Sequence, residues 1–292
     1  MSLFSEQTIL PRESIDLFQV RKQFSMPARL ADSAFLRREI ADRMHERLSM
    51  IRVEPQFVLD AGCGEGADLP LLRNRFPKAG VVALDAAPAM LFEAKAATGK
   101  NGMSLTSAVC GNFAALPFAP NRFDLLWSNL SLHWHPDSLQ VFTEWKRVLG
   151  QDGMLMFSCF GPETLRLLRD AFQEVDRYPH VLPFVEMHDL GDSLVAAGFP
   201  SPVLDREIIT VTYSSAARLL ADVRALGGNA LFERRRGLMG REGYRRLLGY
   251  LERQKDGGGK ISLPFEIIYG HAFCTVKQPE GRCGLPMRFH SP

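Results

Sequence analysis

The sequence predicts an α/β fold with a doubly wound, mainly parallel sheet. From Gln56 onward, short apolar runs alternate with stretches of helical length and composition, a pattern typical of chains that build parallel sheets. The first run leads directly into a glycine-rich turn, as strands of such sheets do at a ligand site. The last two runs are about fifty residues apart, which is far too long for a hairpin. We therefore expect a helical lid inserted between the last two strands.

Ahead of the sheet, residues 15–51 carry the pattern of an amphipathic helix. Apolar residues recur at helical spacing from Phe35 to Leu48, and charged residues lie between them. This helix is expected to end at residues 48–50. We interpret residues 1–54 as an N-terminal helical cap and not as a domain of its own.

Five apolar runs and the four segments between them make up the expected core. Strands are predicted at residues 57–62, 81–86, 107–112, 123–129 and 153–160. Helices are predicted at residues 67–74, 88–97, 138–149 and 162–176. The carboxyl ends of parallel strands open on one edge of the sheet, where such sheets bind ligands. We expect the functional site at that edge.

The last third of the chain spaces its strands more widely. Its predicted elements are a helix at 189–197, a strand at 202–213, helices at 216–226 and 241–254, and a strand at 265–276. We therefore predict a core over residues 55–213, a lid over 214–262, a final core strand over 263–276 and a flexible tail over 277–292.

Composition excludes several classes of protein. With 46% apolar and 23% charged residues, the chain is neither disordered nor fibrous. A net charge of +2 gives no strong field for a polyanion, so we expect no nucleic-acid partner. The apolar runs fall short of the roughly 20 residues of a membrane helix, and the N-terminus lacks a secretory signal; we expect a cytoplasmic protein without a membrane partner. The five scattered cysteines include no CxxC pair, so no metal site is expected.

The turn after the first strand is the strongest functional signal. Gly62, Gly64 and Gly66 allow the backbone to turn tightly and to approach a ligand without interference from a Cβ atom. Asp85 ends the next strand, nineteen residues after Gly66, where doubly wound folds place an acid against ribose hydroxyls. Together these features predict a cofactor of the adenosine type.

Two cofactors fit this turn. Gly62, Gly64 and Ala67 also satisfy the G-x-G-x-x-G/A pattern of dinucleotide binding. Asp60 and Glu65 would then face a pyrophosphate, which is an unfavourable like-charge contact. S-adenosyl-L-methionine instead carries a sulfonium and an α-amino group, which acidic residues favour. We therefore predict S-adenosyl-L-methionine as the cofactor and S-adenosyl-L-homocysteine as its product.

Five motifs between residues 56 and 161 resemble, in the same order, those of the Class I (seven-stranded) methyltransferases. They are VLDAGCGEG, VVALDAAPAML, GNFAALPF, FDLLWSNLSLHW and KRVLGQDGMLMFSCFG. The resemblance implies a Rossmann-like, seven-stranded sheet with the cofactor at its edge. It also implies that the methionine part contacts Asp60, Gly62, Gly64 and the backbone of Asn129, that Asp85 binds the ribose, and that Ala86, Met90, Asn112 and Phe113 surround the adenine. Relatives often carry Asp at position 112, but the carbonyl oxygen of Asn can also accept from the adenine amino group.

Further motifs extend the resemblance over nearly the whole chain. LSLHW, PETLRLLRDAF, LLADVRALGGNA and FEIIYGHAF are similar to the BioC family, the malonyl-acyl-carrier-protein O-methyltransferases of biotin synthesis. That resemblance implies O-methylation of the free carboxylate of malonyl-acyl carrier protein. Three alternatives stay open: an arginine-hydroxylating complex I assembly factor, a methyltransferase for a small acceptor such as a quinone precursor, and a non-catalytic protein that keeps the cofactor fold.

A carboxylate acceptor agrees with the residues near the expected site. Its pKa of about 4 means that it is already ionised at pH 7 and needs no general base. Leu130-Ser131-Leu132 follows Asn129 in place of the Pro-Pro-aromatic sequence of nitrogen methyltransferases. A desolvated malonyl carboxylate needs a partner, for which an arginine fork is suited. The candidate acceptor residues are His133, Trp134, Tyr178, His180, Arg206 and Arg224.

A cluster of arginines lies in and beside the expected lid. Between Arg218 and Arg246, eight arginines stand against three acids. Acyl carrier protein is acidic, so this cluster predicts a docking surface, although a solvated helix face has the same pattern. The expected docking residues are Arg234, Arg235, Arg236, Arg241, Arg245 and Arg246.

Overall fold

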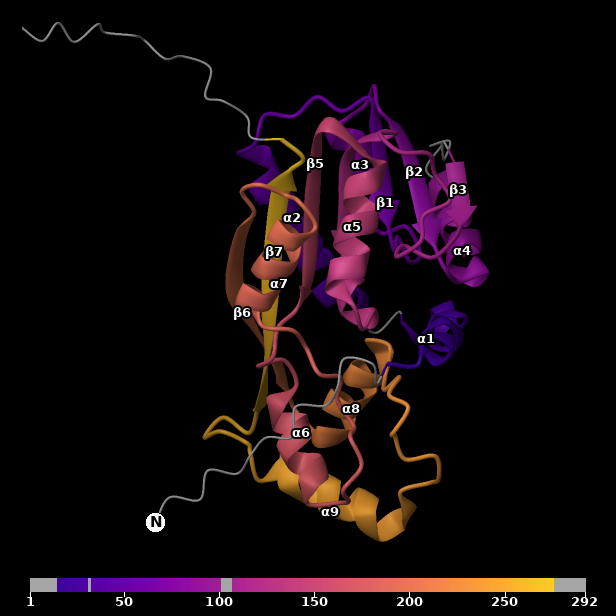
Figure 1. Ribbon diagram of the computed structural model, residues 1–292. Coiled ribbons are helices and arrows are strands. Elements are labelled where there is room, and N and C mark those ends of the chain that lie inside the picture. Colours follow the sequence, from indigo (N-terminus) through magenta and orange to yellow (C-terminus); the bar gives the residue numbers. More distant parts are fainter. Residues whose placement is uncertain (1–14, 31–32, 101–106, 276–292) are drawn as a thin grey trace, which may run out of the picture.

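The computed structural model describes residues 15–30, 33–100 and 107–275. Within these residues the chain forms one seven-stranded sheet in the order β3-β2-β1-β4-β5-β7-β6 (Figure 1). The strands are β1 Phe57–Ala61, β2 Gly80–Asp85, β3 Ser107–Cys110, β4 Phe123–Asn129, β5 Leu149–Phe160, β6 Val203–Tyr213 and β7 Ile261–Phe273. All neighbours pair in parallel except β7, which is antiparallel to both β5 and β6. The prediction of a doubly wound, mainly parallel sheet is confirmed.

The central strands are apolar on both faces because helices cover the sheet on both sides. Val58 and Leu59 of β1 and Leu125 and Leu126 of β4 are all fully buried. The strand order reverses between β1 and β4, so the loops after these two strands diverge and leave a crevice at their carboxyl ends. The functional site is therefore expected between β1 and β4.

The helices of the core form for local reasons. In α5, Ser138–Val148, the side chain of Asp137 caps the helix by accepting from the backbone nitrogen of Gln140. Phe142 and Trp145 lie on the apolar face of α5 and are buried in the core. The other core helices are α2 Ala34–Ser49, α3 Leu69–Arg75, α4 Pro88–Lys100 and α7 Met187–Ala196.

Two differences from the sequence predictions have clear causes. The pattern over residues 15–51 forms α1 Leu17–Phe24, a short 3-10 helix η2 Pro27–Arg29, and α2, because Pro27 has no backbone N–H with which to continue α1. The last strand begins at Ile261 and not near Phe265, and it includes Pro264. Pro264 is tolerated there because this end of β7 pairs with β6 alone, which leaves one edge without a hydrogen-bonding partner in the described sheet.

Helices gather beyond the carboxyl ends of the strands. α8 Ala216–Ala225 and α9 Gly240–Glu252 lie between β6 and β7 in the chain, and α9 packs against both α8 and α6 Arg166–Gln173 (Figure 1). α1 lies near α8 at the same end of the molecule, and a 3-10 helix η4, Leu132–Trp134, follows β4. The insertion between the last two strands is thus present. The predicted tail, 277–292, and residues 1–14 of the predicted cap lie outside the described residues.

Among the helices in the described part of the chain, none combines the length and the apolar character needed to cross a bilayer.

Candidate functional site

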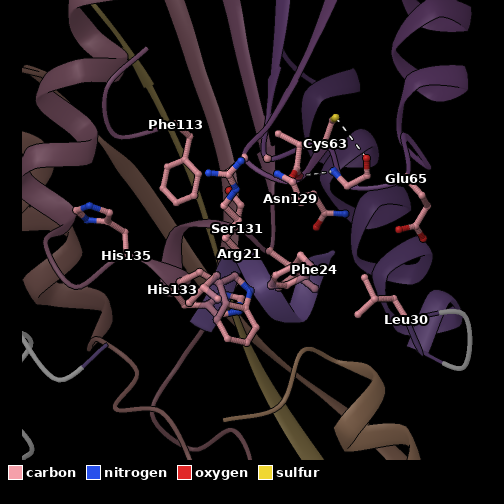
Figure 2. A pocket seen from close by; sticks show the side chains of 18 of the residues that line it. Arg21, Phe24, Leu30, Cys63, Glu65, Phe113, Asn129, Ser131, His133 and His135 are labelled. Atoms are coloured by element: carbon pink, nitrogen blue, oxygen red, sulfur yellow. Dashed lines mark hydrogen bonds between the residues drawn. The ribbon is translucent and has the colours of Figure 1, made fainter. Parts of the chain in front are cut away.

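A cavity of about 530 Å³ opens at the carboxyl ends of β1 and β4 (Figure 2). We call it the larger cavity. The residues predicted to bind the cofactor that line it are Asp60, Gly62, Gly64, Asp85, Ala86, Asn112, Phe113 and Asn129. Met90 does not line it but is buried against Leu30 and Ala87, beneath the wall. The chain thus brings together eight of the nine predicted positions from four separate loops.

The two glycines at the mouth of the turn serve different purposes. Gly62 has a φ of +82°, and a Cβ atom there would lie 2.5 Å from Cβ of Ser131. Gly64 has a φ of +54°, but a Cβ atom there would meet nothing within 4 Å. Gly62 therefore allows the turn to pack against η4, whereas Gly64 leaves open space over the cavity.

Two buried carboxyl groups lie at the base of the larger cavity. Burial and the nearby Asp68 and Asp85 raise the pKa of Asp60 well above its usual value, and one carboxyl oxygen, Oδ2, has no hydrogen-bond partner among the described residues. Burial also raises the pKa of Asp68 to about 6, although its Oδ2 accepts from Nε1 of Trp127 at 2.8 Å. A bound cation would favour the ionised form of both acids. The base of the cavity therefore suits a positively charged ligand.

Glu65 lines the larger cavity together with Asp60, but it also has an ion-pair partner of its own. Its carboxylate pairs with Arg37 of α2 at 2.5 Å, so much of its charge is neutralised. Asp60 and Asp68 form no ion pair within the described part of the chain, and their raised pKa values favour a cationic ligand over a pyrophosphate.

Three side chains predicted to contact the cofactor also form hydrogen bonds with other parts of the protein. Asp85 accepts from the backbone nitrogens of Gly64 at 3.0 Å and Ala87 at 2.8 Å, and so joins the first turn to the second. Asn112 accepts from the backbone nitrogen of Ala114 at 2.9 Å. Asn129 donates to the carbonyl oxygen of Arg37 and accepts from Oγ of Ser158. These side chains are held in place before any ligand binds.

The sequence analysis missed one wall of the larger cavity. Leu17, Phe18, Arg21 and Phe24 of α1 line it, together with Ser131 of the loop after β4. Figure 2 shows Arg21 and Phe24 around the same space as Asn129 and Ser131. The alternation of apolar and charged residues signals a helix here, but no local signal shows which cavity that helix covers.

A smaller cavity, of about 170 Å³, adjoins the larger one. The two share His133, Trp134, Phe160 and Leu226 as lining residues. Burial lowers the pKa of His133 to about 3, so its ring is neutral at pH 7, and its Nδ1 has no hydrogen-bond partner among the described residues. Apolar side chains of α6, α8 and residues 181–184 form most of the remaining wall, and the exposed Arg224 also lines it.

The other three predicted acceptor residues lie farther from the shared wall. His180 lines the smaller cavity, but it stacks on Phe172 and contacts Oδ1 of Asp176 at 2.8 Å. Tyr178 is 52% exposed and lines a separate surface pocket. Arg206 pairs with the buried Glu266 at 3.2 Å and lines neither cavity.

Four of the six predicted docking arginines already have partners. Arg234 pairs with Asp16 at 3.3 Å, and Arg235 pairs with Asp176 at 2.9 Å. Arg245 pairs with Glu242, and Arg246 donates to the carbonyl oxygen of Val175. Arg236 and Arg241 form no ion pair with any described residue, so their charges are available to a partner.

The fold and the acid-lined cavity at the strand reversal define an S-adenosylmethionine-dependent methyltransferase. A family model described as a methyltransferase domain matches residues 59–157, which include the glycine turn and the ends of β2, β3 and β4. The crystal structure of the YcgJ protein from Bacillus subtilis matches with a TM-score of 0.58 at 16% identity, covering 81% of this chain and 98% of its own. The Class I architecture is confirmed.

Curated relatives define the family more closely. A malonyl-[acyl-carrier protein] O-methyltransferase of Laribacter hongkongensis is 39% identical, over 95% of this chain and 97% of its own length. One from Gallionella capsiferriformans is 42% identical, over 89% of this chain and 91% of its own. The chain belongs to the malonyl-[acyl-carrier protein] O-methyltransferase family. The resemblance found in the sequence is therefore confirmed.

Proposed function

We propose that the protein methylates the free carboxylate of a malonyl thioester on acyl carrier protein, as a step in biotin synthesis. The observation that carries the proposal is the pair of adjoining cavities, with an uncharged wall between them: Asp60 and Asp68, which line the larger one, form no ion pair among the described residues, and the smaller one is largely apolar. The names of the relatives support this acceptor. A cytoplasmic location is part of the same proposal.

The residues of the larger cavity suit the parts of the cofactor. We propose that Asp60 binds the α-amino group and that Arg21, which has no ion-pair partner in the described chain, binds the α-carboxylate. Asp85 is proposed to bind the ribose, while Ala86, Asn112 and Phe113 surround the adenine. Met90 would then support Ala87 beneath the cofactor instead of touching it.

The chemistry requires alignment and exclusion of water more than proton transfer. When bound, S-adenosylmethionine would supply its methyl group to a carboxylate oxygen: an O–C bond would form as the S–C bond breaks, leaving a methyl ester and a neutral thioether, with no proton moved. His133 suits a wall that excludes water, because its low pKa keeps its ring uncharged at pH 7. We propose that His133 and Trp134, which are both buried, shield the reaction from solvent. No general base is needed, because the carboxylate is already ionised.

The acceptor site is proposed on the residues that line the smaller cavity. His133, Trp134, His180 and Arg224 satisfy that condition, whereas Tyr178 and Arg206 do not. The pairing of Arg206 with Glu266 and the exposed position of Tyr178 favour structural roles for both. We further propose residues 214–262 as a lid over the acceptor and residues 1–54 as a cap over the cofactor.

A methyl-transfer assay with two carriers tests this function. The protein is incubated with methyl-labelled S-adenosylmethionine and either malonyl-acyl carrier protein or acetyl-acyl carrier protein, which lacks the carboxylate. Label is expected in the malonyl form only, as a base-labile ester. Label in both carriers, or in neither, would contradict a carboxylate acceptor.

A further inference from the structure

We propose that the smaller cavity binds the phosphopantetheine thioester arm of the acceptor, and that Arg224 pairs with the phosphate of that arm and not with the malonyl carboxylate. The inference rests on the proposed function and adds to it the place and orientation of the acceptor.

The smaller cavity has an inner end and an outer rim. Its inner wall consists of His133, Trp134, Phe160 and Leu226, which it shares with the larger cavity. His133, Trp134 and Phe160 are buried. Arg224 and Gly228 are its exposed lining residues, so the opening to solvent lies on their side. An acceptor that enters past Arg224 therefore reaches the cofactor through the wall that the two cavities share.

The size and lining of this space suit a narrow, largely apolar chain. Its volume of about 170 Å³ equals that of about six water molecules in the liquid, at ~30 Å³ each. Leu168, Phe172, Leu220 and Val223 supply apolar walls from α6 and α8. A folded carrier protein cannot enter, so a group borne on the carrier has to reach the shared wall on an extended arm.

The charges are arranged for an anion at the rim and an uncharged wall at the reacting end. The inner wall carries no charge at pH 7, because burial holds the pKa of His133 at about 3. Methylation cancels the charge of the carboxylate, so an arginine paired with it would stabilise the reactant more than the transition state. Arg224 has no ion-pair partner among the described residues, and its guanidinium fork matches a phosphate.

Two small acceptors separate the phosphate from the carboxylate. Malonyl-phosphopantetheine carries both groups, whereas malonyl-pantetheine lacks the phosphate. For Arg224→Gln we expect KM for malonyl-phosphopantetheine to rise about tenfold, the effect of one charge-assisted pair, with kcat unchanged. KM for malonyl-pantetheine should stay within about twofold of the wild type. An equal rise for both acceptors would place Arg224 at the carboxylate and overturn the inference.

A matched variant controls for the loss of positive charge. Arg241 is exposed, has no ion-pair partner in the described chain, and lines neither cavity. Arg241→Gln should leave KM for both small acceptors unchanged. A rise in KM for malonyl-phosphopantetheine equal to that of Arg224→Gln would show a general effect of charge and would also overturn the assignment.

Filling the cavity tests the path of the arm. Val223 is partly buried and lines the smaller cavity, whereas Ala217, on the same helix, is exposed and does not. Val223→Phe should lower kcat/KM for both acceptors at least tenfold and leave the Kd of S-adenosylhomocysteine unchanged, and Ala217→Phe should change neither. Wild-type kcat/KM in Val223→Phe would overturn the assignment of the cavity.

Failure of the proposed function would be recognised separately. In that case the wild type would not methylate any malonyl thioester. Binding of malonyl-phosphopantetheine to the protein loaded with S-adenosylhomocysteine, measured by calorimetry, then decides the site. Weaker binding in Val223→Phe and Arg224→Gln but not in Ala217→Phe would support it, and equal binding in all four proteins would overturn it.

Discussion

Asp68 shows how one side chain can couple ligand binding to pH. It is buried at the base of the larger cavity, and Trp127 donates to it. Burial raises its pKa to about 6, so it is neutral below that pH and an anion above it. A cationic ligand favours the anion, so the acid should become a better partner as the pH rises.

We expect S-adenosylmethionine to bind more tightly at pH 7 than at pH 5, by about fivefold, because ionisation of Asp68 adds an attraction worth less than one pKa unit. Calorimetric titration at the two pH values measures this. S-adenosylhomocysteine, which lacks the sulfonium charge, should show a smaller change.

Asp68→Asn is the matched variant for this prediction. Its amide oxygen can still accept from Nε1 of Trp127, so the local structure is kept while the ionisation is removed. The pH dependence should shrink, leaving the part due to Asp60, whose pKa is also raised. If the variant kept the wild-type dependence, Asp68 would not be the titrating group.

Among single residues, the sequence predicted those whose type is required by the local backbone conformation. Gly62 and Gly64 were predictable because a turn with positive φ requires glycine. The clash that makes Gly62 irreplaceable comes from Ser131, about seventy residues away in the chain, and no local pattern shows that contact. The same holds for the pairing of Glu65 with Arg37.

The start of the N-terminal helix α1 is bonded to the lid segment, residues 214–262. Ile15 forms a β-bridge with Leu231, and the backbone nitrogen of Asp16 donates to the carbonyl oxygen of Ala230 at 2.7 Å. Arg234 adds an ion pair with Oδ2 of Asp16 to this connection. Since α1 also lines the larger cavity, movement of the lid segment and access to the cofactor should be coupled.

Arg234→Met should therefore speed dissociation of S-adenosylhomocysteine by about two- to fivefold, the effect expected for a partly exposed ion pair. Stopped-flow displacement measures the rate. Arg236→Met is the control, because Arg236 lies in the same segment without an ion-pair partner in the described residues. If the two variants behaved alike, the contact of Arg234 with α1 would have no part in retaining the ligand.

Helices and strands were predicted well where the spacing of apolar residues was clear. The strand at 123–129 and the helix at 138–149 match β4 and α5 to within one residue. The break between α1 and α2 was missed, although Pro27 indicates it, because both segments keep a helical pattern.

Over the whole molecule the net charge of +2 conceals a local basic surface. Because Arg234 and Arg235 pair with Asp16 and Asp176, the predicted docking residues without an ion pair among the described residues include Arg236 and Arg241. Long-range attraction between such charges and an acidic carrier is screened by salt.

The double variant Arg236→Glu/Arg241→Glu should raise KM for malonyl-acyl carrier protein about tenfold at low ionic strength, and less at high salt, because charge reversal repels the carrier. KM for malonyl-pantetheine should not change. Arg122→Glu, an exposed residue before β4 at the other end of the sheet, is the control. Equal effects on the carrier and on the small thioester would rule out docking at this surface.

The local sequence pattern was enough to predict the alternating strands and helices, the glycine turn and the acids that favour a sulfonium. The reason is that hydrophobic periodicity and backbone sterics act over a few residues. Only the tertiary structure decided that α1 covers the cofactor site, that a second cavity adjoins it behind His133, and that Arg224 lies at the rim of that cavity. These features join segments up to two hundred residues apart, and their positions depend on how whole elements pack, which no short stretch of sequence encodes.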